Sequence, residues 1–97
     1  MAIPSMKREE LENEIRKVIL ASVQVEGLSP EDLKPDVPLF GDGIGLDSID
    51  ALEIGVALKR RFNVAFKANS EENRKWFKTI ASLGQFISES AGIELED

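Results

Sequence analysis

Apolar residues recur at helical spacing in three long stretches of the chain. The first stretch predicts an amphipathic helix over about residues 6–25, in which the apolar residues at helical spacing are Leu11, Ile15, Val18, Ile19 and Val23. The others predict helices over 47–62 and 79–91, and a weaker pattern over 70–77 indicates a short fourth helix. No pair of strands is expected. The pattern therefore predicts an all-α fold, a small four-helix bundle with three longer helices and one short one.

The connection between the first two long helices is too apolar for a solvated linker. Gly27 ends the first helix, and the segment from Ser29 to Asp32 predicts one short helical turn with a capping serine and a proline at its first position. Residues 34–46 then carry five apolar side chains: Val37, Leu39, Phe40, Ile44 and Leu46. We expect this segment to lie over the bundle, with its glycines allowing a close approach to the next helix.

The chain of 97 residues supports one hydrophobic core, so a single domain over residues 1–97 is expected. Histidine, cysteine and tyrosine are all absent, which removes the usual general base and the thiol nucleophile. A carboxylate hydrolase built on Asp47, Asp50 and Glu53 would need a cleft that a small bundle rarely provides. We therefore expect no enzyme and no catalytic residue.

No metal site is expected either. Asp42 and Glu53 have the spacing of the first and last ligands of a calcium-binding EF-hand loop. However, Ile44 and Leu46 stand where oxygen ligands belong, and Asp47 replaces the required glycine. The EF-hand interpretation fails for these reasons.

The net charge of −6 disfavours nucleic acid as a partner and favours basic proteins. The charge is unevenly placed, because residues 31–58 are acidic with Lys34 as the single cation, whereas residues 59–78 are mostly basic. No apolar run approaches the roughly 20 residues that cross a bilayer, and the start of the chain becomes acidic where a signal peptide would be apolar. A cytoplasmic monomer without membrane insertion is expected.

The helix predicted over 47–62 has two apolar faces. One face carries Ile54, Leu58 and Phe62 and belongs in the core. The other lies roughly opposite, flanked by Asp50, Glu53 and Arg60, and consists of Ile49, Leu52 and Val56. The preceding loop or the short helix could cover this second stripe. Alternatively, it is an exposed surface that docks partner proteins.

Ser48 lies at the start of the same helix. A serine there is often only a cap, but Asp47 already offers a capping carboxylate, and Asp50 three residues later completes a capping box. Ser48 is then free near the first helical position. The helix start favours an anion, so a phosphodiester on Ser48 would suit it, and a thiol-bearing arm would supply chemistry that this cysteine-free chain lacks.

The segment VPLFGDGIGLDSIDALEIGVALKRRFNV resembles the prosthetic-group region of acyl carrier proteins, whose Asp-Ser-Leu-Asp core is present as Asp47-Ser48-Ile49-Asp50. The similarity extends over nearly the whole chain. It implies that a phosphopantetheinyl transferase attaches 4'-phosphopantetheine from coenzyme A to Ser48, which makes the chain a phosphoprotein. Acyl groups would ride on the arm as thioesters for acyl-transferring and chain-elongating enzymes of fatty acid or specialised lipid biosynthesis.

The resemblance also implies roles for other residues. Asp47 would accompany Ser48 at the cofactor site, and partner enzymes would dock on Asp47, Ile49, Asp50, Leu52, Glu53 and Val56. By position, the acyl chain would shelter against Phe40, Ile54, Leu58 and Ile80.

The sequence departs from the family pattern at two places. Lys59, Arg60 and Arg61 stand where many fatty-acid carriers have acidic residues, and residues 67–78 are basic and contain Trp76 and Phe77. The cations suit the end of a helix, or they alter partner choice. Together these departures favour a specialised pathway. A peptidyl or D-alanyl carrier and an unmodified helical adaptor remain the alternatives.

Overall fold

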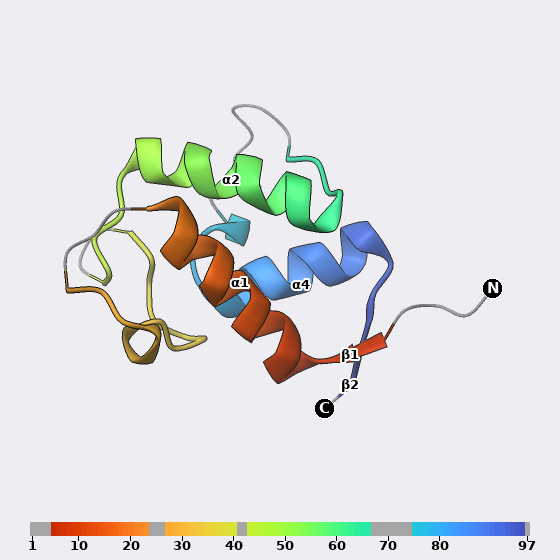
Figure 1. Ribbon diagram of the computed structural model, residues 1–97. Helices are drawn as coiled ribbons and strands as arrows, with labels where there is room; N and C mark the ends of the chain where they lie inside the picture. The colour runs from red at the N-terminus through yellow and green to blue at the C-terminus, as the bar shows by residue number, and fades with distance from the viewer. Residues whose placement is uncertain (1–4, 24–26, 41–42, 67–74, 97) are drawn as a thin grey trace.

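The computed structural model describes residues 5–23, 27–40, 43–66 and 75–96. Within these ranges the chain forms three α-helices, one turn of 3-10 helix and two short strands (Figure 1). In chain order they are β1 (Ser5–Lys7), α1 (Arg8–Ser22), η1 (Pro30–Asp32), α2 (Ser48–Phe62), α4 (Ile80–Ala91) and β2 (Glu94–Glu96). The short helix expected over 70–77 lies outside the described residues apart from 75–77, so the four-helix count stays a prediction.

The first helix is shorter than expected at both ends. It begins at Arg8 because residues 5–7 are extended in β1. It ends at Ser22, because Val23 is already extended while its side chain stays buried in the core. Residues 24 and 25, the last part of the expected helix, lie outside the described residues. Of the expected apolar positions, Leu11, Ile15 and Ile19 are buried, whereas Val18 is only partly buried.

Local hydrogen bonds fix the ends of the other two helices near the predicted positions. The Thr79 hydroxyl accepts a hydrogen bond from the Ser82 N–H at 3.1 Å and so caps α4. Asn63 ends α2 and Gly92 ends α4, both in the left-handed conformation, with φ of 55° and 71°. Glycine suits that conformation because it has no Cβ.

The strand pair corrects the expectation of a purely helical fold. β1 and β2 pair in parallel, with Met6 opposite Leu95 in the middle of the ladder. These two side chains are partly buried and pack against the core, whereas their neighbours are exposed. Strands of three residues are too short for a recognisable alternating pattern, so the sequence did not indicate them.

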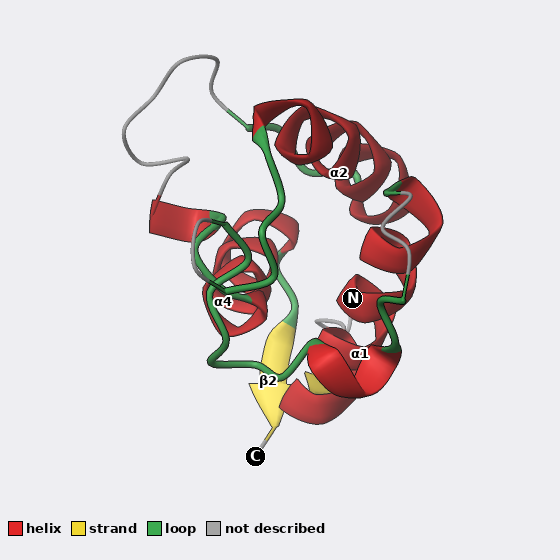
Figure 2. Cartoon of the chain, turned by 90° about the vertical axis from the view of Figure 1, so that its left-hand side faces the viewer, coloured by secondary structure: helices red, strands yellow, loops and turns green. Residues whose placement is uncertain are grey.

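Helix α1 contacts both α2 and α4, and the described parts of the connection, residues 27–40 and 43–46, pack against the bundle (Figures 1 and 2). Leu33, Leu39 and Leu46 are buried in the same core as the helices, as the sequence predicted for the apolar connection. The Leu39 N–H donates to the Lys78 carbonyl at 3.0 Å, and the Leu46 N–H donates to the Leu39 carbonyl at 2.9 Å. These bonds fix the segment that leads into α2.

Candidate functional site

A reciprocal capping box opens α2. The Asp50 N–H donates to Asp47 Oδ1 at 2.9 Å, and the Asp47 N–H donates to Asp50 Oδ2 at 3.0 Å. Both carboxylates are therefore engaged with the backbone, as the sequence predicted. Because these two residues complete the cap, the Ser48 hydroxyl is not needed for it.

Ser48 occupies the first position of α2 and is exposed. None of the hydrogen bonds among the described residues uses its hydroxyl. The first N–H groups of a helix have no partner within the helix and carry partial positive charge. The residues present thus fit a phosphodiester-linked arm, because the hydroxyl is accessible and the helix start favours the anion.

The second apolar stripe of α2 is exposed. Ile49, Leu52 and Val56 retain 66%, 69% and 44% of their accessible surface, whereas Ile54 and Leu58 on the other face retain none. The stripe is therefore not part of the core. Its exposure agrees with the docking interpretation, and the docking itself stays a prediction.

The four residues expected to shelter an acyl chain lie in the core or at its edge. Ile54, Leu58 and Ile80 are completely buried, and Phe40 is partly buried against the same cluster. Phe40 also forms an isolated β-bridge with Leu46 just before α2. An acyl chain would therefore have to displace packed side chains to enter this region.

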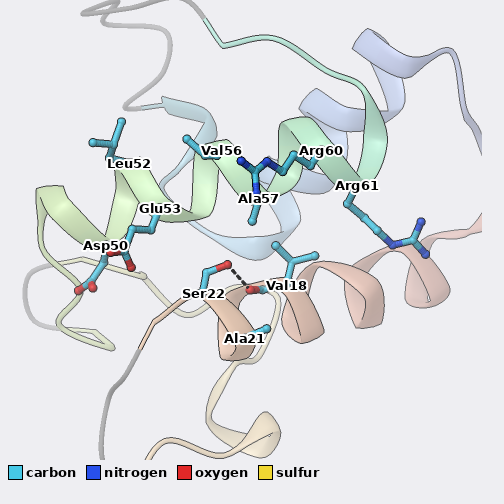
Figure 3. Close-up of a pocket in the computed structure, with 10 residues that line it drawn as sticks. All are labelled: Val18, Ala21, Ser22, Asp50, Leu52, Glu53, Val56, Ala57, Arg60 and Arg61. Carbon is cyan, nitrogen blue, oxygen red and sulfur yellow. Dashed lines mark hydrogen bonds between the residues drawn. The ribbon is translucent and has the colours of Figure 1, made fainter.

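An open groove of about 1100 Å³ runs between α1 and α2 (Figure 3). Helix α2 contributes the wall formed by Asp50, Leu52, Glu53, Val56, Ala57, Arg60 and Arg61. Helix α1 contributes Val18, Ala21 and Ser22, which sequence reasoning did not assign to a site. Their spacing of three and four residues places them on one helix face, but only the packing of the two helices shows that this face borders a groove.

The cations at the end of α2 differ in their surroundings. Arg61 Nη2 lies 3.0 Å from Glu14 Oε2 of α1, and Lys17 also contacts Glu14 at 3.3 Å. The hydrogen bond from Arg61, and then that from Lys17, lower the pKa of Glu14 below its ordinary value. Lys59 and Arg60 are exposed and make no such contact within the described part of the chain.

The aromatic residues Trp76 and Phe77 pack on the bundle. Phe77 is buried and its ring centroid lies 4.8 Å from that of Phe66, while the Trp76 ring lies 5.5 Å from Phe86. Both rings therefore pack against aromatic side chains of the bundle. Residues 67–74 of the same basic segment lie outside the described residues.

Neither a metal site nor a membrane span is found among the described residues. No group of carboxylates there could hold a metal ion. No helix in the described ranges has the length and apolar character needed to cross a membrane.

Comparison with known families defines the class of protein. The family model for the phosphopantetheine attachment site matches residues 16–71, more than half of the chain. The match spans α2 with Ser48 and the groove residues of α1. A search of curated proteins found no match. The chain therefore belongs to the phosphopantetheine attachment-site family.

The family membership identifies the chain as a carrier protein whose prosthetic group is 4'-phosphopantetheine. This agrees with the resemblance to acyl carrier proteins. Domains of this family work with a phosphopantetheinyl transferase and with biosynthetic enzymes, and they are generally non-catalytic.

Proposed function

We propose that this protein is an acyl carrier whose 4'-phosphopantetheine arm is attached to Ser48. The observation that carries the proposal is the free, exposed Ser48 hydroxyl at the first position of α2, beside a cap already completed by Asp47 and Asp50. Acyl intermediates would be held as thioesters on the arm, for fatty acid or specialised lipid biosynthesis. The chain has no cysteine, so the arm would supply its only thiol.

The attachment is a simple displacement at phosphorus. The Ser48 oxygen attacks the phosphorus of coenzyme A that bears the pantetheine group, and the bond to the second phosphate breaks. Adenosine bisphosphate leaves, and the serine proton passes to a base. The chain contains no histidine, so we assign the base to the transferase.

Docking of partner enzymes is proposed for the exposed stripe Ile49, Leu52 and Val56, together with the acidic residues Asp47, Asp50 and Glu53. The support is the combination of exposed apolar surface and a rim of carboxylates. Lys59 and Arg60 have no partner among the described residues, so both cations are available to alter the choice of partner enzymes. Their availability supports the proposal of a carrier dedicated to a specialised pathway. We also propose that the protein is a monomer, since a carrier must visit several active sites. Its proposed location is the cytoplasm.

The test is intact-mass measurement after incubation with coenzyme A and a phosphopantetheinyl transferase. The wild type should gain the mass of one phosphopantetheine and one titratable thiol. Ser48→Ala should gain neither, because only that hydroxyl forms the phosphodiester. Ser90→Ala, which removes another exposed helical serine, is the matched control and should be modified like the wild type.

Two results would contradict the proposal. If folded Ser48→Ala gained the full mass, the arm would be attached at another hydroxyl. If the folded wild type gained no mass with several transferases, the unmodified helical adaptor would become the better interpretation.

A further inference from the structure

The groove between α1 and α2 has opposite charges at its two ends. Glu53 and Arg60 both line it, both are exposed, and neither makes a hydrogen bond or ion pair within the described part of the chain. They are seven residues apart on α2, which places them about 10 Å apart along the helix axis. An unpaired carboxylate and an unpaired guanidinium thus face the same groove about two turns apart.

The middle of the groove is apolar and hollow. Val56 and Ala57 lie between the two charges on α2, and Val18 of α1 points toward them across the groove (Figure 3). Ala21 has a small side chain, and the Ser22 hydroxyl donates to the Val18 carbonyl of its own helix at 2.6 Å. The floor is therefore free of large or unsatisfied polar groups, so another helix could approach closely.

The ion pair between Arg61 and Glu14 holds the two walls of the groove together at its basic end. Because of this ion pair, Arg61 is not an unpaired charge. Arg60 is consequently the free cation that the groove presents to a partner, and Glu53 is the free anion at the other end, next to the capping residue Asp50.

We infer that the groove between α1 and α2 binds an amphipathic helix of a partner protein that is itself bipolar. A basic side chain of that helix would face Glu53, apolar side chains would contact Val56 and the floor, and a carboxylate would face Arg60. This inference rests on the proposed role of α2 as the docking helix. It adds the second wall from α1 and a specific requirement for an acidic group on the partner.

The test uses two synthetic helical peptides of about five turns with identical composition and an identical leucine stripe. The bipolar peptide has lysines in one half and glutamates in the other, whereas the mixed peptide alternates them. A helix can lie in the groove in either direction, so the bipolar peptide can match both poles whichever way it binds. Binding is measured by calorimetry and by amide NMR shifts at about 0.15 M salt, where distant charges are screened.

The full chain without the arm is used, so the result is independent of whether Ser48 is modified. The bipolar peptide should bind about threefold to tenfold more tightly than the mixed peptide, as expected for two exposed ion pairs. Amide shifts should appear on both walls, over residues 18–22 of α1 and 50–61 of α2.

Charge reversals then locate the interaction. Arg60→Glu should abolish the preference for the bipolar peptide. Lys59→Glu makes the same change in charge at an exposed residue that does not line the groove, and it should leave the preference intact. Circular dichroism checks that both variants are folded, which we expect because neither cation has a partner among the described residues.

The inference would be overturned by equal binding of the two peptides, by no binding of either, or by equal effects of the two reversals. Shifts confined to α2 would also overturn it, since α1 would then form no part of the site. If the peptide result holds while Ser48 proves unmodifiable, the groove remains but the acyl carrier proposal fails.

Discussion

At the scale of single residues, Ser48 is available because its neighbours perform the capping. A serine at the N-cap position commonly accepts a hydrogen bond from an N–H of the first turn, but in α2 Asp47 holds that position and Ser48 follows it. Here the carboxylates of Asp47 and Asp50 make both bonds of the box. The same two bonds fix the backbone at the start of α2, so a transferase would meet Ser48 at a defined place on the helix.

The loop before this cap requires a glycine at position 43. A Cβ built at Gly43 would lie 1.9 Å from the Pro38 carbonyl oxygen, which accepts a hydrogen bond from the Ile44 N–H at 2.9 Å. Gly43→Ala should therefore lower the free energy of unfolding by about 2 kcal/mol, in the range of overpacked sites. Denaturant unfolding with the Gly55→Ala variant alongside measures the effect.

Gly55 is the matched control because it lies inside α2. Its added Cβ would meet Phe77 at an ordinary contact distance of 3.5 Å, so the alanine should raise helix stability by about 0.5 to 1 kcal/mol. A stable Gly43→Ala variant would show that the loop does not close as described.

At the scale of elements, α2 takes part in the core and in two overlapping surfaces. Its buried face joins the core, and its exposed stripe is the proposed docking surface. Leu52 and Val56 of that stripe also line the groove with α1. Arg61 and Glu14 connect the two helices across 47 positions of sequence. At the basic end of α2, Arg61 thus has a structural role, whereas Arg60 is available to a partner.

The link between α1 and α2 should depend on pH. The lowered pKa of Glu14 means that its ionised form stabilises the fold. This contribution is complete above the ordinary pKa of a glutamate and is lost as the pH falls through the lower pKa of the folded protein. Arg61→Gln should therefore destabilise the protein near neutral pH, and the difference from the wild type should shrink in acid.

NMR titration of the Glu14 carboxyl measures this effect directly. In Arg61→Gln the pKa should rise toward its ordinary value, because the first cause of the shift is removed. Arg60→Gln is the control, and its Glu14 pKa should match that of the wild type. An unchanged pKa in Arg61→Gln would show that the ion pair does not persist in solution.

At the scale of the whole molecule, the core is already filled. Ile54, Leu58 and Ile80 have no exposed surface, so an acyl chain can enter only by separating them. Side chains in the interior of a protein are close-packed, so separating them costs free energy. The free energy gained by burying the acyl chain must exceed that cost. Long apolar cargo should satisfy this condition better than short polar cargo.

Loading the arm with different groups tests this. Octanoyl-loaded protein should unfold with a free energy about 2 kcal/mol higher than alanyl-loaded protein, less than the full transfer value of the chain because the core must rearrange. Thermal or denaturant unfolding measures the difference, and Ser48→Ala treated in the same way should show none. Equal stability of the two loaded forms would exclude the acyl pocket that the resemblance implies and would favour an aminoacyl carrier.

The sequence by itself determined the features that depend on short separations. Hydrogen bonds between residues three positions apart form the caps of α2 and α4 and the turn at Pro30. The helical period of the apolar residues also distinguished the buried face of α2, with Ile54 and Leu58, from its exposed face. The exposed face consists of Ile49, Leu52 and Val56. The free position of Ser48 follows from the same local rule. These features are set by neighbouring residues alone, so the composition and spacing of the residues suffice to predict them.

Only the tertiary structure decided the contacts between distant segments. No periodic signal in the sequence indicates the parallel pair of β1 and β2 or the bond between Arg61 and Glu14. The spacing of Val18, Ala21 and Ser22 places them on one helix face, but it does not show that this face borders a groove. Each arises because the helices pack in one particular arrangement, which brings segments together that are far apart along the chain. Packing of the whole core selects that arrangement, and no single segment encodes it.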